Sequence, residues 1–132
     1  MKRYVLDSYS IISYFERDKG FDTIIDLLEK ATVNEHELSM NIINWGEVYY
    51  IILWEQGNKE AGLFENNFDK LPVRLVYPDI DLIRRASIYK AHNSLSYADC
   101  IAAATANVNK GTLVTGDNEF IKLDKEISIK WI

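Results

Sequence analysis

The sequence predicts an α/β protein, a three-layer sandwich in which a central, mainly parallel sheet is covered by helices on both faces. Short apolar runs rich in β-branched residues alternate along the chain with longer segments of helical periodicity. Such alternation favours parallel strands joined by right-handed crossovers. The 132 residues include only two prolines and six glycines, so we expect a single domain, residues 1–132, without a linker.

The first third of the chain contains two predicted strands and two predicted helices. Residues 4–6 form a short apolar strand, ended by an Asp–Ser pair that favours a helix N-cap. A short helix over 10–16 and a second over 21–30 follow, the second with apolar residues at helical spacing. Residues 36–40 are the weakest strand prediction. The pattern indicates the first β–α–β crossover of the sheet.

The middle of the chain is predicted to be two helices and a strand. Residues 41–56 are apolar on nearly every side, and their length favours a helix that stops at Gly57. A second helix is expected over 59–70. Residues 73–77 read as a strand because an apolar run is bounded there by two prolines.

The last third continues the alternation. A helix is expected from a capping aspartate over 79–91, and an alanine-rich helix over 96–111. Residues 112–115 form a strand that ends in a turn at 116–118. The final strand, 127–132, shows alternating apolar and polar residues.

Composition narrows the function classes. The net charge of −5 has the wrong sign for a protein that holds nucleic acid by bulk electrostatics, although a bound metal could supply a local positive field. Cys100 is the only cysteine, which excludes an internal disulfide and a cysteine zinc site. The longest uncharged apolar run, 48–54, is too short to cross a membrane, and the apolar run at 4–6 is too short for the apolar region of a signal peptide. We therefore expect a cytoplasmic protein.

Four acidic residues are the candidate site. Asp7 and Asp117 each follow a predicted strand, and the carboxyl ends of parallel strands face one crevice. Glu47 lies within the most apolar helix, where an ionised carboxylate needs a cation, hydrogen bonds or solvent. Asp99 lies in the first turn of the alanine-rich helix. Each acid also has a structural alternative, as a helix cap, a turn residue or part of a solvated stripe.

If the four acids converge, their chemistry is specific. Neighbouring carboxylates repel one another unless a cation lies between them. A set of oxygen ligands without Cys or His suits Mg²⁺ or Mn²⁺. Such a site generates a metal-activated water and hydrolyses phosphodiesters.

The ordered set of four acids resembles the PIN-domain family, most closely the ribonuclease toxins of VapBC-type toxin–antitoxin modules. Three stretches carry the resemblance: Val-Leu-Asp-Ser at 5–8, Ser-Tyr-Ala-Asp-Cys-Ile-Ala-Ala-Ala at 96–104 and Thr-Gly-Asp-Asn-Glu-Phe at 115–120. Glu47 matches the second acid by its position on a central helix. By the same resemblance, Thr115 and Ser8 are expected to support the metal site.

The resemblance implies a Mg²⁺- or Mn²⁺-dependent endoribonuclease that cleaves single-stranded RNA, forms a homodimer and is neutralised by a small antitoxin. Apolar side chains of the two middle helices are expected to contact the antitoxin: Tyr49, Tyr50, Leu53, Trp54, Leu63, Phe64 and Phe68. The candidates for RNA phosphate contacts, first interpreted as solvated helix faces, are Arg84, Arg85, Lys90, His92, Lys122 and Lys125.

Two alternatives remain at this stage. One is a Mg²⁺-dependent aspartate phosphotransfer domain, as in receivers or haloacid-dehalogenase-like phosphatases. The phosphatase pattern needs a second aspartate two residues after Asp7, where the chain has Tyr9. The other alternative is a catalytically inactive PIN-like binding module, which the complete set of acids disfavours.

Overall fold

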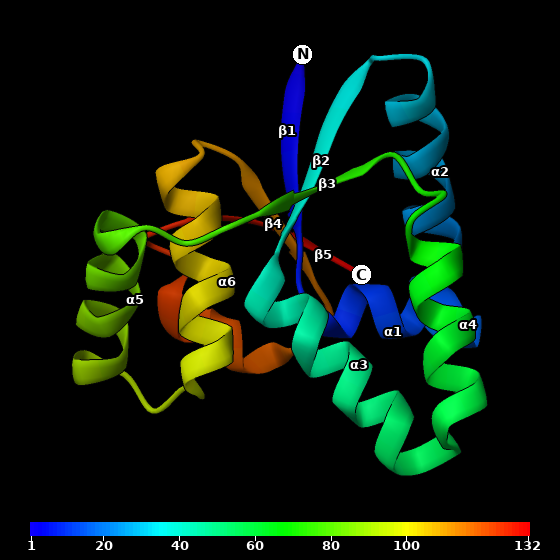
Figure 1. Cartoon of the computed structure of the whole chain (residues 1–132). Helices are drawn as coiled ribbons and strands as arrows, with labels where there is room; N and C mark the ends of the chain where they lie inside the picture. The colour runs from blue at the N-terminus through cyan, green and yellow to red at the C-terminus, as the bar shows by residue number, and fades with distance from the viewer.

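A five-stranded parallel sheet with strand order β3-β2-β1-β4-β5 forms the centre of the computed structural model, which describes residues 1–132 (Figure 1). The strands are β1 (Lys2–Leu6), β2 (His36–Asn41), β3 (Val73–Val76), β4 (Thr112–Thr115) and β5 (Ser128–Trp131). The helices are α1 (Ser8–Glu16), α2 (Phe21–Thr32), α3 (Ile42–Gln56), α4 (Asn58–Phe68), α5 (Ile80–His92), α6 (Tyr97–Val108) and the 3₁₀ helix η1 (Asn118–Leu123). The predicted α/β class is confirmed, and the sheet is parallel throughout.

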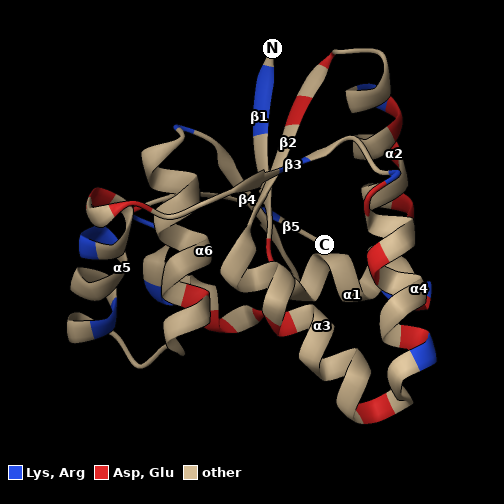
Figure 2. Cartoon of the chain, viewed as in Figure 1, with Lys and Arg blue, Asp and Glu red and all other residues tan.

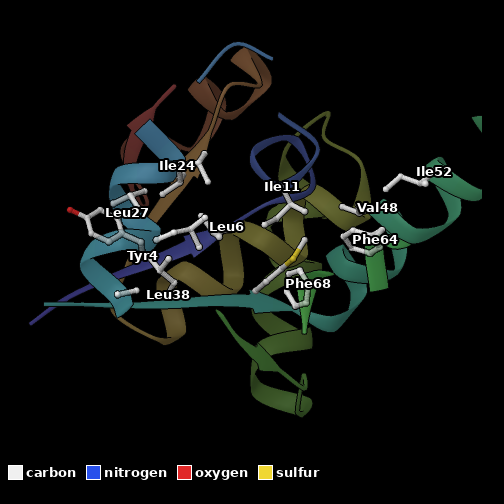
Figure 3. Close-up of a cluster of buried hydrophobic side chains, with 14 of the residues drawn as sticks. Tyr4, Leu6, Ile11, Ile24, Leu27, Leu38, Val48, Ile52, Phe64 and Phe68 are labelled. Carbon is white, nitrogen blue, oxygen red and sulfur yellow. The ribbon is translucent and has the colours of Figure 1, made fainter. Parts of the chain in front are cut away.

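The sheet separates two hydrophobic cores because successive side chains of a strand point to opposite faces. On β1, Tyr4 and Leu6 enter the core beneath α1 to α4, whereas Val5 enters the core beneath α5 and α6. Figure 3 shows the first core, where Phe64 of α4 lies beside Val48 of α3. Figure 1 shows α5 and α6 on one side of the sheet and α2 and α4 on the other.

The observed elements differ from the predicted ones mainly at their ends. The first helix begins at Ser8 instead of residue 10, because Asp7 caps it directly. Residues 118–123 form a 3₁₀ helix where only a turn was predicted. The last strand is shorter than 127–132, since the Ile127 amide bonds to the Leu123 carbonyl at 3.1 Å and so belongs to the preceding turn. No helix is both long and apolar enough to cross a bilayer.

The strand order reverses beside β1, and we call the region outside the carboxyl ends of β1 and β4, where Asp7 and Asp117 lie, the acidic crevice. The chain runs from β1 outward to β2 and β3, and then returns to place β4 on the other side of β1. Ligand sites of open α/β sheets lie where the order reverses in this way, outside the carboxyl ends of the strands. Receiver domains have the order 2-1-3-4-5, so the receiver alternative is wrong for this chain.

Candidate active site

Asp7 is the residue directly after the central strand β1. Its side chain is 2% exposed, and its Oδ1 accepts a hydrogen bond from the Ser10 amide at 2.8 Å, which caps α1. The capping interpretation is therefore correct. A cap does not require such burial, however, because most N-cap carboxylates keep contact with water. The Thr115 hydroxyl at the end of β4 also interacts with this carboxylate and lowers its pKa.

Glu47 enters the crevice from α3, one turn after β2 ends. It is half-buried, and the Ser8 hydroxyl at the start of α1 donates to its Oε1. The Ser8 hydroxyl also lies 3.3 Å from the Asn44 carbonyl oxygen. Ser8 thus joins the chain just after Asp7 to α3. The Glu47 carboxylate therefore contacts a neighbouring element and remains partly open to solvent.

Asp99 lies in the first turn of α6. Its amide donates to the Ser96 hydroxyl at 3.1 Å, so Ser96 caps α6, and the same hydroxyl also interacts with the Asp99 carboxylate. The residues that follow on α6 are buried and small, which allows close packing against the sheet: Ala102, Ala103, Ala104 and Ala106. This packing brings Asp99 close enough to the strand ends for the charge of Asp117 to raise its pKa.

Asp117 follows β4, the strand beside β1. The buried Thr115 hydroxyl accepts from the Asp117 amide at 3.0 Å, and Asp117 Oδ1 accepts from the Glu119 amide at 3.0 Å. A Cβ at Gly116, between them, would lie 2.2 Å from Cε1 of Tyr9, so the Tyr9 ring would have to move. The tyrosine ring thus packs directly on the turn that presents Asp117.

The charges of these residues interact. Burial raises the pKa of Asp7 to about 7, with the neighbouring Thr115 hydroxyl and Ser10 opposing and the charge of Asp99 adding to it. Burial also raises the pKa of Asp99 to about 6, followed by the charge of Asp117, while the Ser96 hydroxyl opposes. Smaller increases at Asp99 come from the charge of Glu47 and of Glu119. All four predicted acids therefore share one electrostatic environment.

No group of three or more carboxylates is arranged to enclose a metal ion with the side chains as they stand. The donor set nevertheless fits a hard divalent cation, because it consists of carboxylate and hydroxyl oxygens without nitrogen or sulfur. A cation would also relieve the repulsion that raises the pKa of Asp99. In Figure 2, acidic segments of α3 and α6 lie together below the sheet.

Three residues near the acids were not singled out from the sequence. Asn44 is 1% exposed and its Nδ2 donates to the Ala98 carbonyl at 3.0 Å, which ties α3 to the residue before Asp99. Its Oδ1 is buried without a partner. Asn41 is fully buried and its Nδ2 donates to the Thr105 hydroxyl at 3.0 Å. Glu119 adds a fifth carboxylate near Asp99.

Sequence comparison identifies the class of protein that this fold and these acids define. Residues 4–126 match the PIN domain family, and the chain belongs to it. PIN domains are typically nucleases that use a divalent metal. A search of curated protein sequences found no significant match.

Solved structures with the same fold include components of toxin–antitoxin systems. VapBC2 from Rickettsia felis, bound to a promoter DNA fragment, aligns over 97% of each chain with 12% identity and a TM-score of 0.78. DNA-bound VapBC from Salmonella typhimurium aligns over 98% of each chain with 14% identity and a TM-score of 0.77. A VapC toxin of Mycobacterium tuberculosis that cleaves the sarcin–ricin loop shares 13% identity over 90% of this chain and 93% of its own, with a TM-score of 0.71. The fold is therefore that of VapC toxins.

Proposed function

We propose that this protein is a Mg²⁺- or Mn²⁺-dependent endoribonuclease that cleaves single-stranded or loop RNA. One observation carries the proposal: four separate chain segments bring carboxylates to the crevice where the strand order reverses, and these carboxylates interact electrostatically. Such an arrangement costs stability unless a cation occupies it. Sequestering four acids at one point is therefore best explained by metal binding.

The chain's own residues have distinct roles in this proposal. Asp7, Glu47, Asp99 and Asp117 would hold the cation, and a bound divalent ion supplies polarisation of the phosphodiester and a water of lowered pKa. Thr115 orients the Asp117 turn through its hydroxyl, and Ser8 holds the Glu47 carboxylate. The raised pKa values of Asp7 and Asp99 in the metal-free protein mean that protons held by these two acids must leave on metal binding.

The proposal is tested by cleavage of single-stranded RNA in the presence of Mg²⁺ or Mn²⁺. Asp99→Asn preserves side-chain shape but removes the charge, and should reduce the cleavage rate by about 100- to 1000-fold. Asp22→Asn, an exposed acid in the first turn of α2, is the matched control and should retain full activity. Equal rates for Asp99→Asn and the wild-type chain would contradict the proposal. Binding of RNA without cleavage in either metal would instead identify an inactive PIN-like binding module.

The toxin role in a toxin–antitoxin pair is part of the same proposal. The α3–α4 pair exposes apolar side chains, with Trp54 84% and Tyr50 56% exposed. Leu63 borders a small cavity of about 180 Å³, together with Phe15 and Ile52. Three of the residues expected to contact an antitoxin pack in or against the hydrophobic core, so we do not assign them to the docking surface: Tyr49, Phe64 and Phe68.

The partner test uses the product of the reading frame that adjoins the gene. Co-expression with a true antitoxin should suppress ribonuclease activity, and Leu63→Asp should restore it, because a buried charge would oppose docking of an apolar segment. The same variant without the partner should cleave RNA at the wild-type rate. If the partner suppressed the ribonuclease activity of Leu63→Asp as strongly as that of the wild-type chain, the surface around Leu63 would not be the docking site.

A homodimer is also proposed, with a second copy packing on the α5 face. Tyr77 and Ile80 at the start of that face are 69% and 71% exposed, and Ile88 on the same helix is 44% exposed. Exposed apolar groups of this kind mark contact surfaces when they gather together. Analytical ultracentrifugation should show a dimer for the wild-type chain and a monomer for Ile80→Asp. A wild-type monomer, or a dimer in both, would contradict the assignment.

A further inference from the structure

The amino edge of the sheet, opposite to the acidic crevice, collects positive charge. Five cations lie there, and we call them the basic edge: Lys2, Arg3, Arg74, Lys110 and Lys130. Figure 2 shows blue segments on β1 and on the loop that leads from α6 to β4, away from the acidic segments of α3 and α6. The whole chain carries a net charge of −5, so this concentration does not follow from composition.

The basic edge borders a cavity of about 390 Å³. Its floor is a row of residues that pair across three strands: Val5, Ser39 and Arg74. Glu37 is the one carboxylate in its lining, and it bridges the two guanidinium groups, with Arg3 Nε at 3.2 Å and Arg74 NH2 at 3.4 Å. A shared carboxylate orients both guanidinium groups and leaves most of their N–H donors free.

Two further features of this cavity indicate a ligand of negative charge. Asn109 lines the cavity, and its Nδ2 is a buried donor without a partner. Lys110, next to it, has a φ of 53°, in the left-handed region that favours glycine or asparagine. This conformation is a common left-handed end of a helix, shared by Arg17 at the end of α1, and it leaves the Lys110 ammonium group at the border of the cavity.

A second cavity of about 630 Å³ continues the basic edge. It shares Arg3 and Lys110 with the first cavity and adds Lys2 and Lys130, and no carboxylate lines it. The cations extend from Arg74 on β3 to Lys130 on β5, four strand spacings of about 4.8 Å, or roughly 19 Å in all. Arg74 is in register with Val5 and shares its face of the sheet, whereas Lys130 is in register with Leu6 on the other face, so the basic edge includes both faces. A single small anion cannot contact both ends of such a surface, whereas a polymer of phosphates can.

We propose that the basic edge binds the phosphodiester backbone of an RNA strand, at a distance from the acidic crevice where the strand is cut. The identification of the polymer as RNA rests on the proposed function. Arginine forks and lysine ammonium groups match phosphate oxygens, and the aromatic ring that lines the second cavity, Tyr4, is only 9% exposed. Contact with phosphates but without base stacking makes the binding independent of sequence.

The test measures binding of fluorescently labelled poly(U) in EDTA, where no cleavage can occur, as a function of salt. Lys2→Glu with Lys110→Glu reverses two exposed charges of the basic edge, neither of which makes an ion pair in the structure. The slope of log K against log salt is negative, and each lost phosphate contact reduces its magnitude by about 0.7. The double variant should therefore have a slope that is smaller in magnitude by about 1.4, and it should bind poly(U) roughly tenfold more weakly. Lys59→Glu on α4 with Lys70→Glu just after that helix has the same net charge and should keep the wild-type slope.

Several outcomes would overturn the proposal. An unchanged slope for the Lys2 and Lys110 variant, or an equal loss for the α4 control pair, would show that this edge makes no local phosphate contacts. Displacement of poly(U) by polyglutamate at lower monomer concentration than by unlabelled poly(U) would show that an acidic polypeptide is the occupant.

The result is separable from the proposed function, because binding in EDTA does not depend on catalysis. If the chain cleaves no RNA but the slope changes as expected, the nuclease proposal fails and the basic edge stands. With an active nuclease, the Lys2 and Lys110 variant should raise the KM for poly(U) and leave cleavage of a uridine trinucleotide unchanged, since that substrate cannot reach both edges. An equal KM for poly(U) in the variant and the wild-type chain would contradict the proposal.

Discussion

The two edges of the sheet differ in the sign of their charge and in how that charge is compensated. At the amino edge, Glu37 lies between Arg3 and Arg74, and the groups remain exposed. At the carboxyl edge, Asp7 is buried and Asp99 is surrounded by other carboxylates, and no cationic side chain pairs with either. Exposed ion pairs contribute little to folding and tolerate change. Uncompensated buried acids oppose folding, which indicates that their arrangement is maintained for function.

The largest expected effect is the pH dependence of stability at the carboxyl edge. An unfolded aspartate titrates near 3.9, whereas folding raises the pKa of Asp7 to about 7. Between these values the native protein holds a proton that the unfolded chain has lost, so this contribution to the free energy of unfolding is full below pH 4 and is lost as pH rises through 7. Asp7→Asn mimics the protonated acid and should become about 4 kcal/mol more stable, relative to wild type, between pH 4 and 8.

Urea denaturation in EDTA measures this difference, with Asp22→Asn as the control whose stability should follow wild type at every pH. If the Asp7→Asn and wild-type curves ran parallel across this range, the carboxylate would not be desolvated in the native state.

A smaller effect is expected from two glycines that flank β4, one at each edge. A Cβ at Gly116 would lie 2.2 Å from Tyr9, whereas a Cβ at Gly111 would lie 3.1 Å from the Arg3 carbonyl oxygen. Gly116→Ala should therefore lower the free energy of unfolding by about 1 to 3 kcal/mol and reduce cleavage, because it displaces the turn that carries Asp117. Gly111→Ala should cost less and leave cleavage unchanged.

The combination of Gly116→Ala with Tyr9→Ala should recover part of the stability, because the double variant removes the ring that the new methyl group meets. Thermal denaturation of the wild-type chain, the two single variants and the double variant measures this coupling. Additive effects of Tyr9→Ala and Gly116→Ala would show that the ring does not pack on the turn.

The smallest effect concerns the contact between α3 and α6. Asn44→Ala removes the hydrogen bond to the Ala98 carbonyl and leaves that buried oxygen without its partner. We expect a loss of about 1 kcal/mol in the free energy of unfolding, limited because the unpaired Asn44 Oδ1 is removed as well. The cleavage rate should fall about tenfold at unchanged KM, since Glu47 and Asp99 lose their common support. A rise in KM without a fall in the cleavage rate would show that Asn44 does not support Glu47 and Asp99.

The sequence was informative where local pattern determines structure. The apolar run before Asp7 and the alternation in β5 predicted strands because periodicity reflects burial of one or both faces. Asp7 and Asp117 were found because parallel strands end at one edge. Helix ends and the 3₁₀ segment after Asp117 were less accessible, since capping and turn geometry depend on single hydrogen bonds.

Contacts between distant segments could not be predicted in this way. Asn44 looks like any polar residue on a helix until α6 is packed against it. The basic edge is also formed by the strand order. Arg3 on β1 and Arg74 on β3 are far apart in the sequence, and β2 brings them together by pairing with both strands. Two of the cations that the sequence suggested for RNA phosphate contacts have partners within the chain instead. Arg84 lies 2.7 Å from the Asp81 carboxylate, and Lys122 Nζ donates to the Ser94 carbonyl at 2.9 Å.

The central claim is that the acids at the carboxyl edge form a site for a divalent cation, and calorimetric melting with and without Mg²⁺ tests it most directly. At about 100 times its dissociation constant, the ion should stabilise the wild-type chain by about 2.7 kcal/mol and raise its Tm. Asp7→Asn and Asp99→Asn should abolish that shift, whereas Asp22→Asn should retain it. A Tm that does not respond to Mg²⁺ or Mn²⁺ in the wild-type chain, or an equal shift in all four proteins, would contradict the account.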